Sequence, residues 1–307
     1  MLVTAKPLLI KARAKKYAVP AFNINNLETL QAVMEAAVAM KSPVIIQTSE
    51  GAIEYAGIDY LVALVRVAAQ TKIPVVLHLD HGKNLKTIKH AIDSGYTSVM
   101  FDGSAQTFND NVRNTKLVVK WAQAKKISVE AEIGVLAGIE DLVKVKDGSA
   151  TLTDPKQAAE FADKTGCDSL AVAIGTSHGA YKFSEKKHPH LDLARLEAIA
   201  KLVKIPIVLH GASGVREDVL KIAEEYGAKL GEARGILDQD IKAAIFRGVA
   251  KVNIDTDLRL AFTAGIREAV ADSPSVIDPR KLLMPAKLLM TEVAKQKMKL
   301  FGSAGKA

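Results

Sequence analysis

The stretch PVVLHLDHG, residues 74–82, joins a run of apolar residues to two histidines and an aspartate. An apolar run of strand length that ends in polar side chains is typical of a buried strand in a parallel sheet. The same form returns in SLAVAIGT (169–176) and PIVLHGAS (206–213). The fold therefore has to contain several buried strands, each followed by polar residues such as histidine, aspartate or serine that can act in binding or catalysis.

Strand-length apolar segments alternate along the whole chain with alanine-rich, amphipathic segments of helix length. The strand candidates are residues 17–23, 43–50, 74–80, 98–104, 128–134, 169–176, 206–213 and 250–256, and helix candidates between them include 27–40, 58–70 and 108–126. Eight such repeats in one chain predict an α/β protein with a single (β/α)8 TIM barrel. A doubly wound open sheet is the alternative, but no GxGxxG follows the first strand.

Two segments depart from this alternation. Residues 135–154 show little helical periodicity, and we expect a long loop that acts as a lid. Residues 278–302 are expected to form one or two helices appended to the barrel, with a break at Pro285. Because no linker or low-complexity tract divides the chain, residues 1–307 are interpreted as one domain.

The composition is that of an ordinary globular protein, with 49% hydrophobic and 5% aromatic residues. The single cysteine, Cys167, cannot form an internal disulfide, and charged residues interrupt the apolar stretches near the start. We therefore expect a soluble, cytoplasmic protein with no membrane partner. The net charge of +8 comes from scattered lysines, which favours phosphorylated metabolites over nucleic acid as anionic partners.

Polar side chains collect at the carboxyl ends of the strand candidates. In a parallel barrel all these ends open onto one face, so residues far apart in sequence can reach one ligand. We therefore predict a single site on that face. The residues at these ends are Asn23, Ser49, Glu50, Asp80, His81, Asp102, Glu132, His178, His210, Asn253 and Asp255.

Three histidines at the strand ends share one pattern, an apolar strand followed by histidine and glycine. They are His81, His178 and His210. Three imidazoles from separate strands can hold a metal ion and leave a fourth position open, which is how catalytic zinc is usually bound. The glycine after each would give the backbone room to approach a ligand. A single buried histidine is more often a hydrogen-bonded core residue, but three with the same neighbour favour a metal site.

The remaining histidines are assigned no metal. His78 has the strand parity of Asp80 and is expected one layer deeper inside the barrel. His90 falls on a helix candidate, and His188 and His190 lie in a lysine- and proline-flanked segment expected to be an exposed loop.

The motifs together resemble those of class II, zinc-dependent fructose-1,6-bisphosphate aldolases. The resemblance extends from end to end through YAVPAFN, TSEGA, HLDHG, SVMFDGS, VEAEIG, GIED, AIGTSHGAYK, LHGASG and VNIDTDLR. It implies reversible cleavage of fructose 1,6-bisphosphate to dihydroxyacetone phosphate and glyceraldehyde 3-phosphate, a reaction of glycolysis and gluconeogenesis. Tagatose-1,6-bisphosphate aldolase shares the zinc and phosphate motifs and stays open as an alternative.

The resemblance also implies roles for individual residues. Asp80 would exchange the proton on the C4 hydroxyl, and Glu140, in the expected lid, would move the proton of dihydroxyacetone phosphate. Glu130 has no matched role and is interpreted as structural. The implied metal-site residues are His81, His178 and His210 as zinc ligands, with Asp102 and Glu132 as carboxylates that orient them or form a second divalent site.

Further residues are implied for the substrate and its phosphates. The loops 211–213 and 253–256 follow the seventh and eighth strand candidates, the usual phosphate site of such barrels. The family also implies a monovalent cation, sodium or potassium, near one phosphate and a homodimer or homotetramer in which Arg280 reaches a neighbouring subunit. The nominated residues are Asn23, Ser49, Gly179, Lys182, Gly211, Ser213, Asn253, Asp255, Thr256, Arg259 and Arg280.

Three other classes of protein are alternatives to this family. A Schiff-base aldolase needs a lysine beside the substrate carbonyl, but the strand at 169–176 has none and Lys251 stands at the start of its strand. A metal-dependent hydrolase commonly carries an HxH pair on the first strand, which residues 17–23 lack. A sugar-phosphate sensor or surface adhesin would bind its ligand without turnover.

Overall fold

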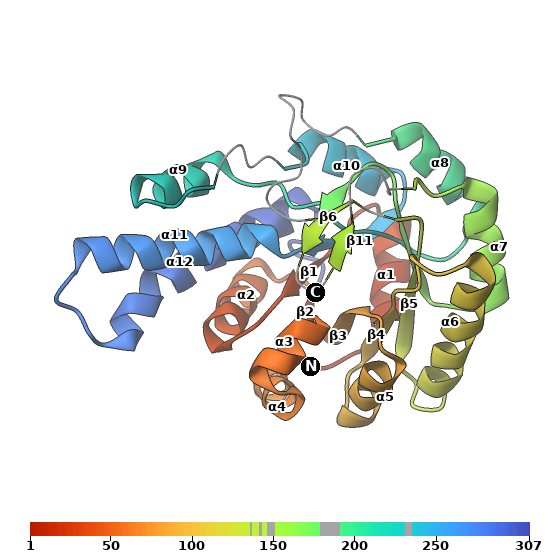
Figure 1. The fold of residues 1–307 in the computed structure, drawn as a ribbon, viewed down its shortest axis with the longest axis horizontal. Coiled ribbons are helices and arrows are strands. Elements are labelled where there is room, and N and C mark those ends of the chain that lie inside the picture. The colour runs from red at the N-terminus through yellow and green to blue at the C-terminus, as the bar shows by residue number, and fades with distance from the viewer. Residues whose placement is uncertain (136, 141–142, 146–150, 179–190, 231–234) are drawn as a thin grey trace.

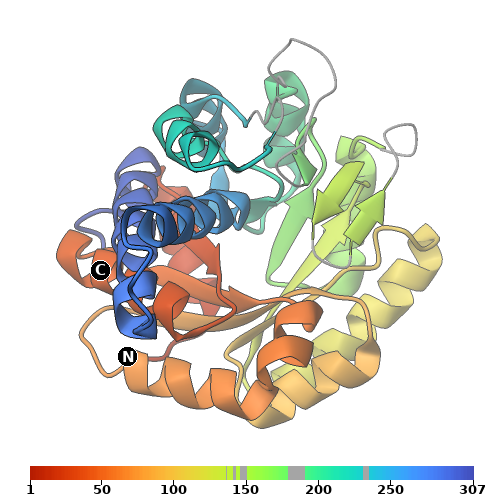
Figure 2. The same cartoon turned by 60° about the vertical axis from the view of Figure 1, so that its left-hand side comes forward.

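Eight parallel strands close into a barrel in the computed structural model, which describes residues 1–135, 137–140, 143–145, 151–178, 191–230 and 235–307. For residues 137–140, 143–145, 177 and 178 the description covers the backbone. Around the barrel the strands follow the order β1-β11-β10-β8-β5-β4-β3-β2, with helices on the outside (Figure 1). The predicted (β/α)8 barrel is therefore confirmed, and Figure 2 shows the same ring from a second direction.

Each barrel strand lies within or overlaps a strand candidate, and most are shorter than the candidate. The apolar runs form the paired part, while their polar ends continue into loops. The strands are β1 (Val19–Asn23), β2 (Val44–Thr48), β3 (Val75–Gly82), β4 (Ser98–Phe101), β5 (Ser128–Ile133), β8 (Ser169–Val172), β10 (Ile207–Leu209) and β11 (Val249–Ile254).

Several helices begin at side chains that cap them. Asn26, Thr107 and Asp154 each accept a hydrogen bond from a backbone N–H in the first turn of α2, α6 and α7, which satisfies a donor left free at the helix start. The helices are α1 (Ala5–Ala14), α2 (Leu27–Met40), α3 (Glu50–Ala56), α4 (Ile58–Ala68), α5 (Leu85–Ser94), α6 (Phe108–Gln123), α7 (Pro155–Thr165), α8 (Leu193–Leu202), α9 (Glu217–Glu225), α10 (Asp238–Phe246), α11 (Thr256–Asp272) and α12 (Pro279–Leu300).

Helix α1 closes the amino-terminal end of the barrel. Its buried face packs against residues near the strand starts, in an apolar cluster that is separate from the main core between barrel and helices. The end of the barrel opposite the predicted site is therefore packed with apolar side chains. The cluster consists of Ala5, Leu9, Ala12, Tyr17, Val19, Ala21, Ile45, Val76 and Ala250.

The segment expected to be a plain loop contains two strands. β6 (Ala137–Glu140) and β7 (Val143–Val145) pair antiparallel, and β6 also pairs with the short strand β9 (Ser177–His178). These strands form a small three-stranded sheet beside the barrel. The long connection expected over residues 135–154 thus contains a short hairpin in the part that the structure describes.

The carboxyl-terminal extension is confirmed as helical, but the predicted break is wrong. α12 runs without interruption through Pro285, although proline has no N–H to donate to the preceding turn. Its packing against α11 is very close, since a Cβ added at Gly265 would lie 2.4 Å from the Cα of Ala286. This contact between backbones holds α12 in place across the proline. Among the described residues, no helix combines the length and apolarity needed to cross a bilayer.

Candidate active site

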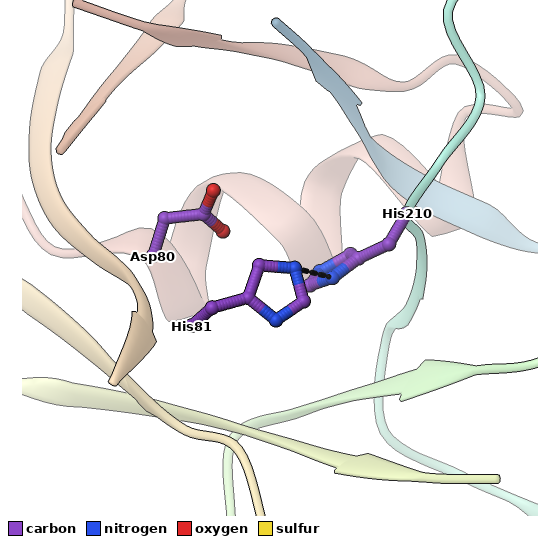
Figure 3. A group of neighbouring side chains, drawn as sticks. All are labelled: Asp80, His81 and His210. Carbon is purple, nitrogen blue, oxygen red and sulfur yellow. Dashed lines mark hydrogen bonds between the residues drawn. The ribbon is translucent and has the colours of Figure 1, made fainter. Parts of the chain in front are cut away.

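The end of β3 delivers two predicted residues to the mouth of the barrel. Asp80 is buried inside the barrel, and the next residue, His81, has a backbone φ of 45°. A left-handed conformation is costly for a residue with a side chain, and such strain is concentrated at functional positions. Here it turns His81 toward His210, which follows β10, as Figure 3 shows.

Two imidazole nitrogens meet at this point. His81 Nε2 lies 2.9 Å from His210 Nδ1, and the two rings are arranged edge to face. The other nitrogen of each ring faces a carboxylate: His81 Nδ1 lies 2.9 Å from Asp102, and His210 Nε2 lies 2.8 Å from Glu130. If each ring donates its N–H to its carboxylate, both lone pairs point at the same place. This is the arrangement that a metal ion requires.

In the absence of a cation, a proton can occupy the space between the rings. Burial disfavours a charge on His81, but Asp80, Asp102 and Glu132 raise its pKa to about 10. Burial, and then the positive His81, lower the pKa of His210 to about 4. The site thus holds one positive charge between two nitrogens.

The carboxylate of Glu132 also indicates that a cation belongs here. It is buried, and its Oε2 lies 3.6 Å from His81 Nδ1 and 3.6 Å from His210 Nδ1. That oxygen has no hydrogen-bond partner among the described residues. Burial, followed by the charge of Asp102, raises the pKa of Glu132 well above its ordinary value.

Two groups of side chains in the described part of the chain could hold an ion. Asp80, His81 and His210 form one, and His81, Asp102 and Glu132 form the other, with the ligand atoms of each group within 4.8 Å of one another. The predicted ligands His81 and His210 are thus brought together, and Asp102 and Glu132 lie beside them. Nitrogen and carboxylate donors of this kind suit zinc.

Glu130 and Lys251 lie one layer deeper in the barrel and support the metal-site residues. Lys251 Nζ lies 2.9 and 3.1 Å from the two oxygens of Glu130, whose Oε1 also accepts from His210. Against the effect of burial, Lys251 and then His210 lower the pKa of Glu130, which is therefore ionised. The lysine is engaged in this ion pair, which does not suit a Schiff-base nucleophile.

His78 occupies the same layer, as predicted. Its Nδ1 lies 2.8 Å from Ser98 Oγ, and its Nε2 lies 3.9 Å from Glu130. Burial, and then the charge of Lys251, lower the pKa of His78 to about 3, so the ring is neutral. Its interior position is confirmed, although its Nε2 has no hydrogen-bond partner among the described residues. His90 lies on α5, also as predicted.

Three amide side chains surround the carboxylate of Asp80. Asn23 donates to Oδ2 at 2.9 Å, Gln47 donates to Oδ2 at 3.2 Å, and Asn253 donates to Oδ1 at 3.0 Å. Although burial opposes ionisation, His81 and the other nearby cations lower the pKa of Asp80. The result is an ionised carboxylate held in one orientation beside the histidine pair.

The glycine after each histidine does not serve one common purpose. A Cβ added at Gly82 would lie 2.6 Å from Met100 O and 2.8 Å from Ile88, so β3 requires glycine to pack against β4 and α5. The structure thus gives Gly82 a packing role, and its approach to a ligand stays a prediction. Gly211 instead has a φ of 58°, which a residue without Cβ adopts at little cost.

A cavity of about 380 Å³ is lined in part by Asn23, the residue that donates a hydrogen bond to Asp80. Asp255 and Arg259 line it, and Arg259 Nε donates to Asp255 Oδ1 at 2.8 Å. The other lining residues are Asn25, Asn26, Thr29, Tyr55, Leu258, Phe262 and Thr263. The cavity offers polar groups and one guanidinium to an anionic ligand.

The remaining nominated residues fall into three groups. Gly211 and Ser213 are in the loop after β10, Thr256 is the first residue of α11, and Ser49 caps α3 through a hydrogen bond from Ala52 N. Arg280 is on the first turn of α12, 87% exposed and paired with Asp278. The backbone of Glu140 and His178 lies in β6 and β9, but their side chains, together with Gly179, Lys182, His188 and His190, lie outside the described residues.

Sequence reasoning missed two residues of this site. Gln47 was overlooked because it stands inside the apolar run of β2, and Glu130 was assigned a structural role only. A signal existed for both. Each is a polar residue within a strand, at the same inward parity as the site residue Asn23 or Glu132. Polar residues at inward positions of a barrel need partners, and here those partners are site residues.

Comparison with known proteins agrees with this geometry. The family model for class-II fructose-bisphosphate aldolase matches residues 3–306. The fructose-bisphosphate aldolase of Thermus caldophilus is 52% identical to this chain, over the full length of both. That of Giardia intestinalis is 46% identical, over 100% of this chain and 94% of its own length. The crystal structure of the YdjI aldolase of Escherichia coli K12 covers both chains fully, with a TM-score of 0.79 and 35% identity. The chain therefore belongs to the class II fructose-bisphosphate aldolase family.

Proposed function

We propose that the protein catalyses the reversible aldol cleavage of fructose 1,6-bisphosphate with a zinc ion held by His81, His178 and His210. The observation that carries the proposal is the pair of imidazole nitrogens, 2.9 Å apart, beside the ionised carboxylate of Asp80. When bound, zinc would act as a Lewis acid that polarises the substrate ketone. Asp102 and Glu132 would orient His81 or hold a second divalent ion.

Asp80 is proposed as the group that moves the proton of the C4 hydroxyl. In the cleavage direction an ionised carboxylate can accept that proton as the C3–C4 bond breaks, and in synthesis it returns it. The amides of Asn23, Gln47 and Asn253 hold both carboxylate oxygens in place, which fixes the direction of proton transfer. Glu140 is proposed to exchange the proton of dihydroxyacetone phosphate.

The phosphate groups are proposed to bind at two places. One is the loop after β10, with Gly211 and Ser213, together with the junction of β11 and α11, with Asn253, Asp255 and Thr256; Gly179, Lys182 and a sodium or potassium ion would join them. Backbone amides and small hydroxyl side chains in such loops suit an anion. The other lies around Ser49 and Arg259 at the cavity beyond Asn23, with Arg280 contributed by a neighbouring subunit of a homodimer or homotetramer. The cytoplasm is the proposed location.

The direct test measures triose phosphate release by zinc-loaded protein from fructose 1,6-bisphosphate and from tagatose 1,6-bisphosphate. We expect a higher kcat/KM on the fructose substrate, loss of activity after EDTA treatment, and recovery on addition of zinc. Preference for the tagatose substrate would change the assignment of the sugar. Full activity in protein shown to be free of metal would refute the zinc site.

A further inference from the structure

A buried ion pair links the carboxyl-terminal helix to the loop that follows β10. Lys297, in the last turn of α12, lies 2.9 Å from Asp257 Oδ1, and both side chains are almost completely buried. Asp257 is at the start of α11, and its Oδ2 accepts a hydrogen bond from Gly214 N at 3.1 Å. One carboxylate thus connects α12 to the backbone of that loop.

The loop is also held from its other side. Ile236 N donates to Ser213 O at 3.1 Å, and a Cβ added at Gly235 would lie 2.3 Å from the carbonyl carbon of Gly214. A Cβ at Gly214 would in turn lie 2.7 Å from Lys297 Nζ. Residues 213 and 214 are therefore confined between α12 and the segment at 235–236.

We propose that Lys297, acting through Asp257, is a positioning residue for substrate phosphate. This inference rests on the proposed function, which places Gly211 and Ser213 at a phosphate. The hydrogen bond from Gly214 to Asp257 fixes the backbone directly after Ser213, and the ammonium of Lys297 fixes the carboxylate that accepts it. Because a buried carboxylate without its cation is costly, loss of Lys297 would release the loop.

The first experiment compares K297M with the unsubstituted zinc-loaded enzyme. Binding of dihydroxyacetone phosphate is measured by calorimetry, and binding of inorganic phosphate to metal-free protein by phosphorus NMR. We expect both dissociation constants and the KM for fructose 1,6-bisphosphate to rise about 10-fold, with kcat changed less than about threefold and zinc content unchanged. K295M is the matched control, since Lys295 is on the same helix and pairs with Glu292 at the surface.

A second comparison removes the unpaired charge and isolates the hydrogen bond. K297M/D257N and K297M/D257A both lack the ion pair, but only the amide oxygen introduced by D257N can accept from Gly214 N. We expect K297M/D257N to bind phosphate within about threefold of the unsubstituted protein, and K297M/D257A to bind about 10-fold more weakly.

The outcomes separate the two proposals. If the unsubstituted protein does not bind dihydroxyacetone phosphate, the proposed function fails and the positioning role fails with it. If it binds, but K297M/D257N and K297M/D257A have the same dissociation constants, the positioning role is overturned while the proposed function stands. A fall in kcat with an unchanged KM would also overturn it, because the effect would then not be on phosphate binding.

Discussion

Replacement of Glu130 by glutamine tests the buried layer beneath the metal site. Glu130 is 1% exposed and makes charge-assisted contacts with Lys251 at 2.9 and 3.1 Å and with His210 at 2.8 Å. Glutamine has nearly the same shape, but it cannot balance the ammonium of Lys251. The substitution therefore changes charge and hydrogen bonding with little change in packing volume.

Two effects of different size are expected. Breaking a buried ion pair leaves an uncompensated charge, which lowers the free energy of unfolding by about 3–5 kcal/mol. A glutamine oxygen can still accept from His210 Nε2, although the bond is weaker without the charge. Residues that orient a metal-binding histidine in this way typically contribute about 10–100-fold in metal affinity. We therefore expect E130Q to bind zinc at least about 10-fold more weakly.

The assay has to separate stability from metal affinity. Urea unfolding of metal-free protein measures the first, and competition with a chromophoric chelator measures the second. E130Q/K251M removes both charges and should recover most of the stability lost in E130Q, but not the zinc affinity. E160Q is the surface control, because Glu160 pairs with Lys164 in solvent, and we expect a change below about 1 kcal/mol.

Two results would refute this reasoning. Zinc affinity in E130Q equal to that of the unsubstituted protein would mean that Glu130 does not orient His210. Full recovery of zinc affinity in E130Q/K251M would mean that the unpaired ammonium, and not the lost carboxylate, weakens the site.

Three further substitutions probe other parts of the site. D80A should retain stoichiometric zinc yet lose about 10²–10⁴-fold in kcat, and loss of the metal would instead make Asp80 a ligand. In metal-free protein the pKa of His78 is about 3 in the folded state and about 6.5 in the unfolded chain, so the free energy of unfolding falls as pH drops below 6.5. Between pH 6.5 and 4.5 the unsubstituted protein should therefore lose about 2–3 kcal/mol more than H78Q. Equal losses in urea unfolding would contradict the buried neutral ring. G82A should lower the free energy of unfolding by about 3 kcal/mol through overpacking against Met100. G166A is the control, because the space at that position is open, and it should lower the free energy of unfolding by about 1 kcal/mol. The reverse order in thermal unfolding would contradict the packing argument.

The barrel could be predicted from sequence because its strands are buried on both sides. Strands such as β2 and β3 therefore begin as short apolar runs. Their length and the lack of a helical period distinguish these runs from the amphipathic helices between them. The hairpin of β6 and β7 carries no such run, since its strands are only four and three residues long. The continuity of α12 across Pro285 depends on a contact with Gly265 that is distant in sequence.

The residues of the site were predictable to the extent that they lie at strand ends. Asp80, His81 and His210 were found because each is polar and directly follows an apolar run. The inward position of Glu130 could be inferred from strand parity, but its partners could not, because the sequence does not show that Lys251 and His210 face this carboxylate. The same holds for Gln47, whose amide reaches Asp80 from the adjacent strand.

The apolar floor formed by α1 has a consequence for solvent isotope exchange. Leu9, Ala21, Ile45 and Val76 are at most 1% exposed and belong to the apolar cluster that packs with α1. Among the described residues, this packing closes the α1 end of the barrel, so we expect deuterium to reach Asp80 and the histidines from the strand-end side. A molecule seated in the mouth would cut these groups off from bulk water, so isotope wash-in at the reacting carbon measures how often the mouth is open.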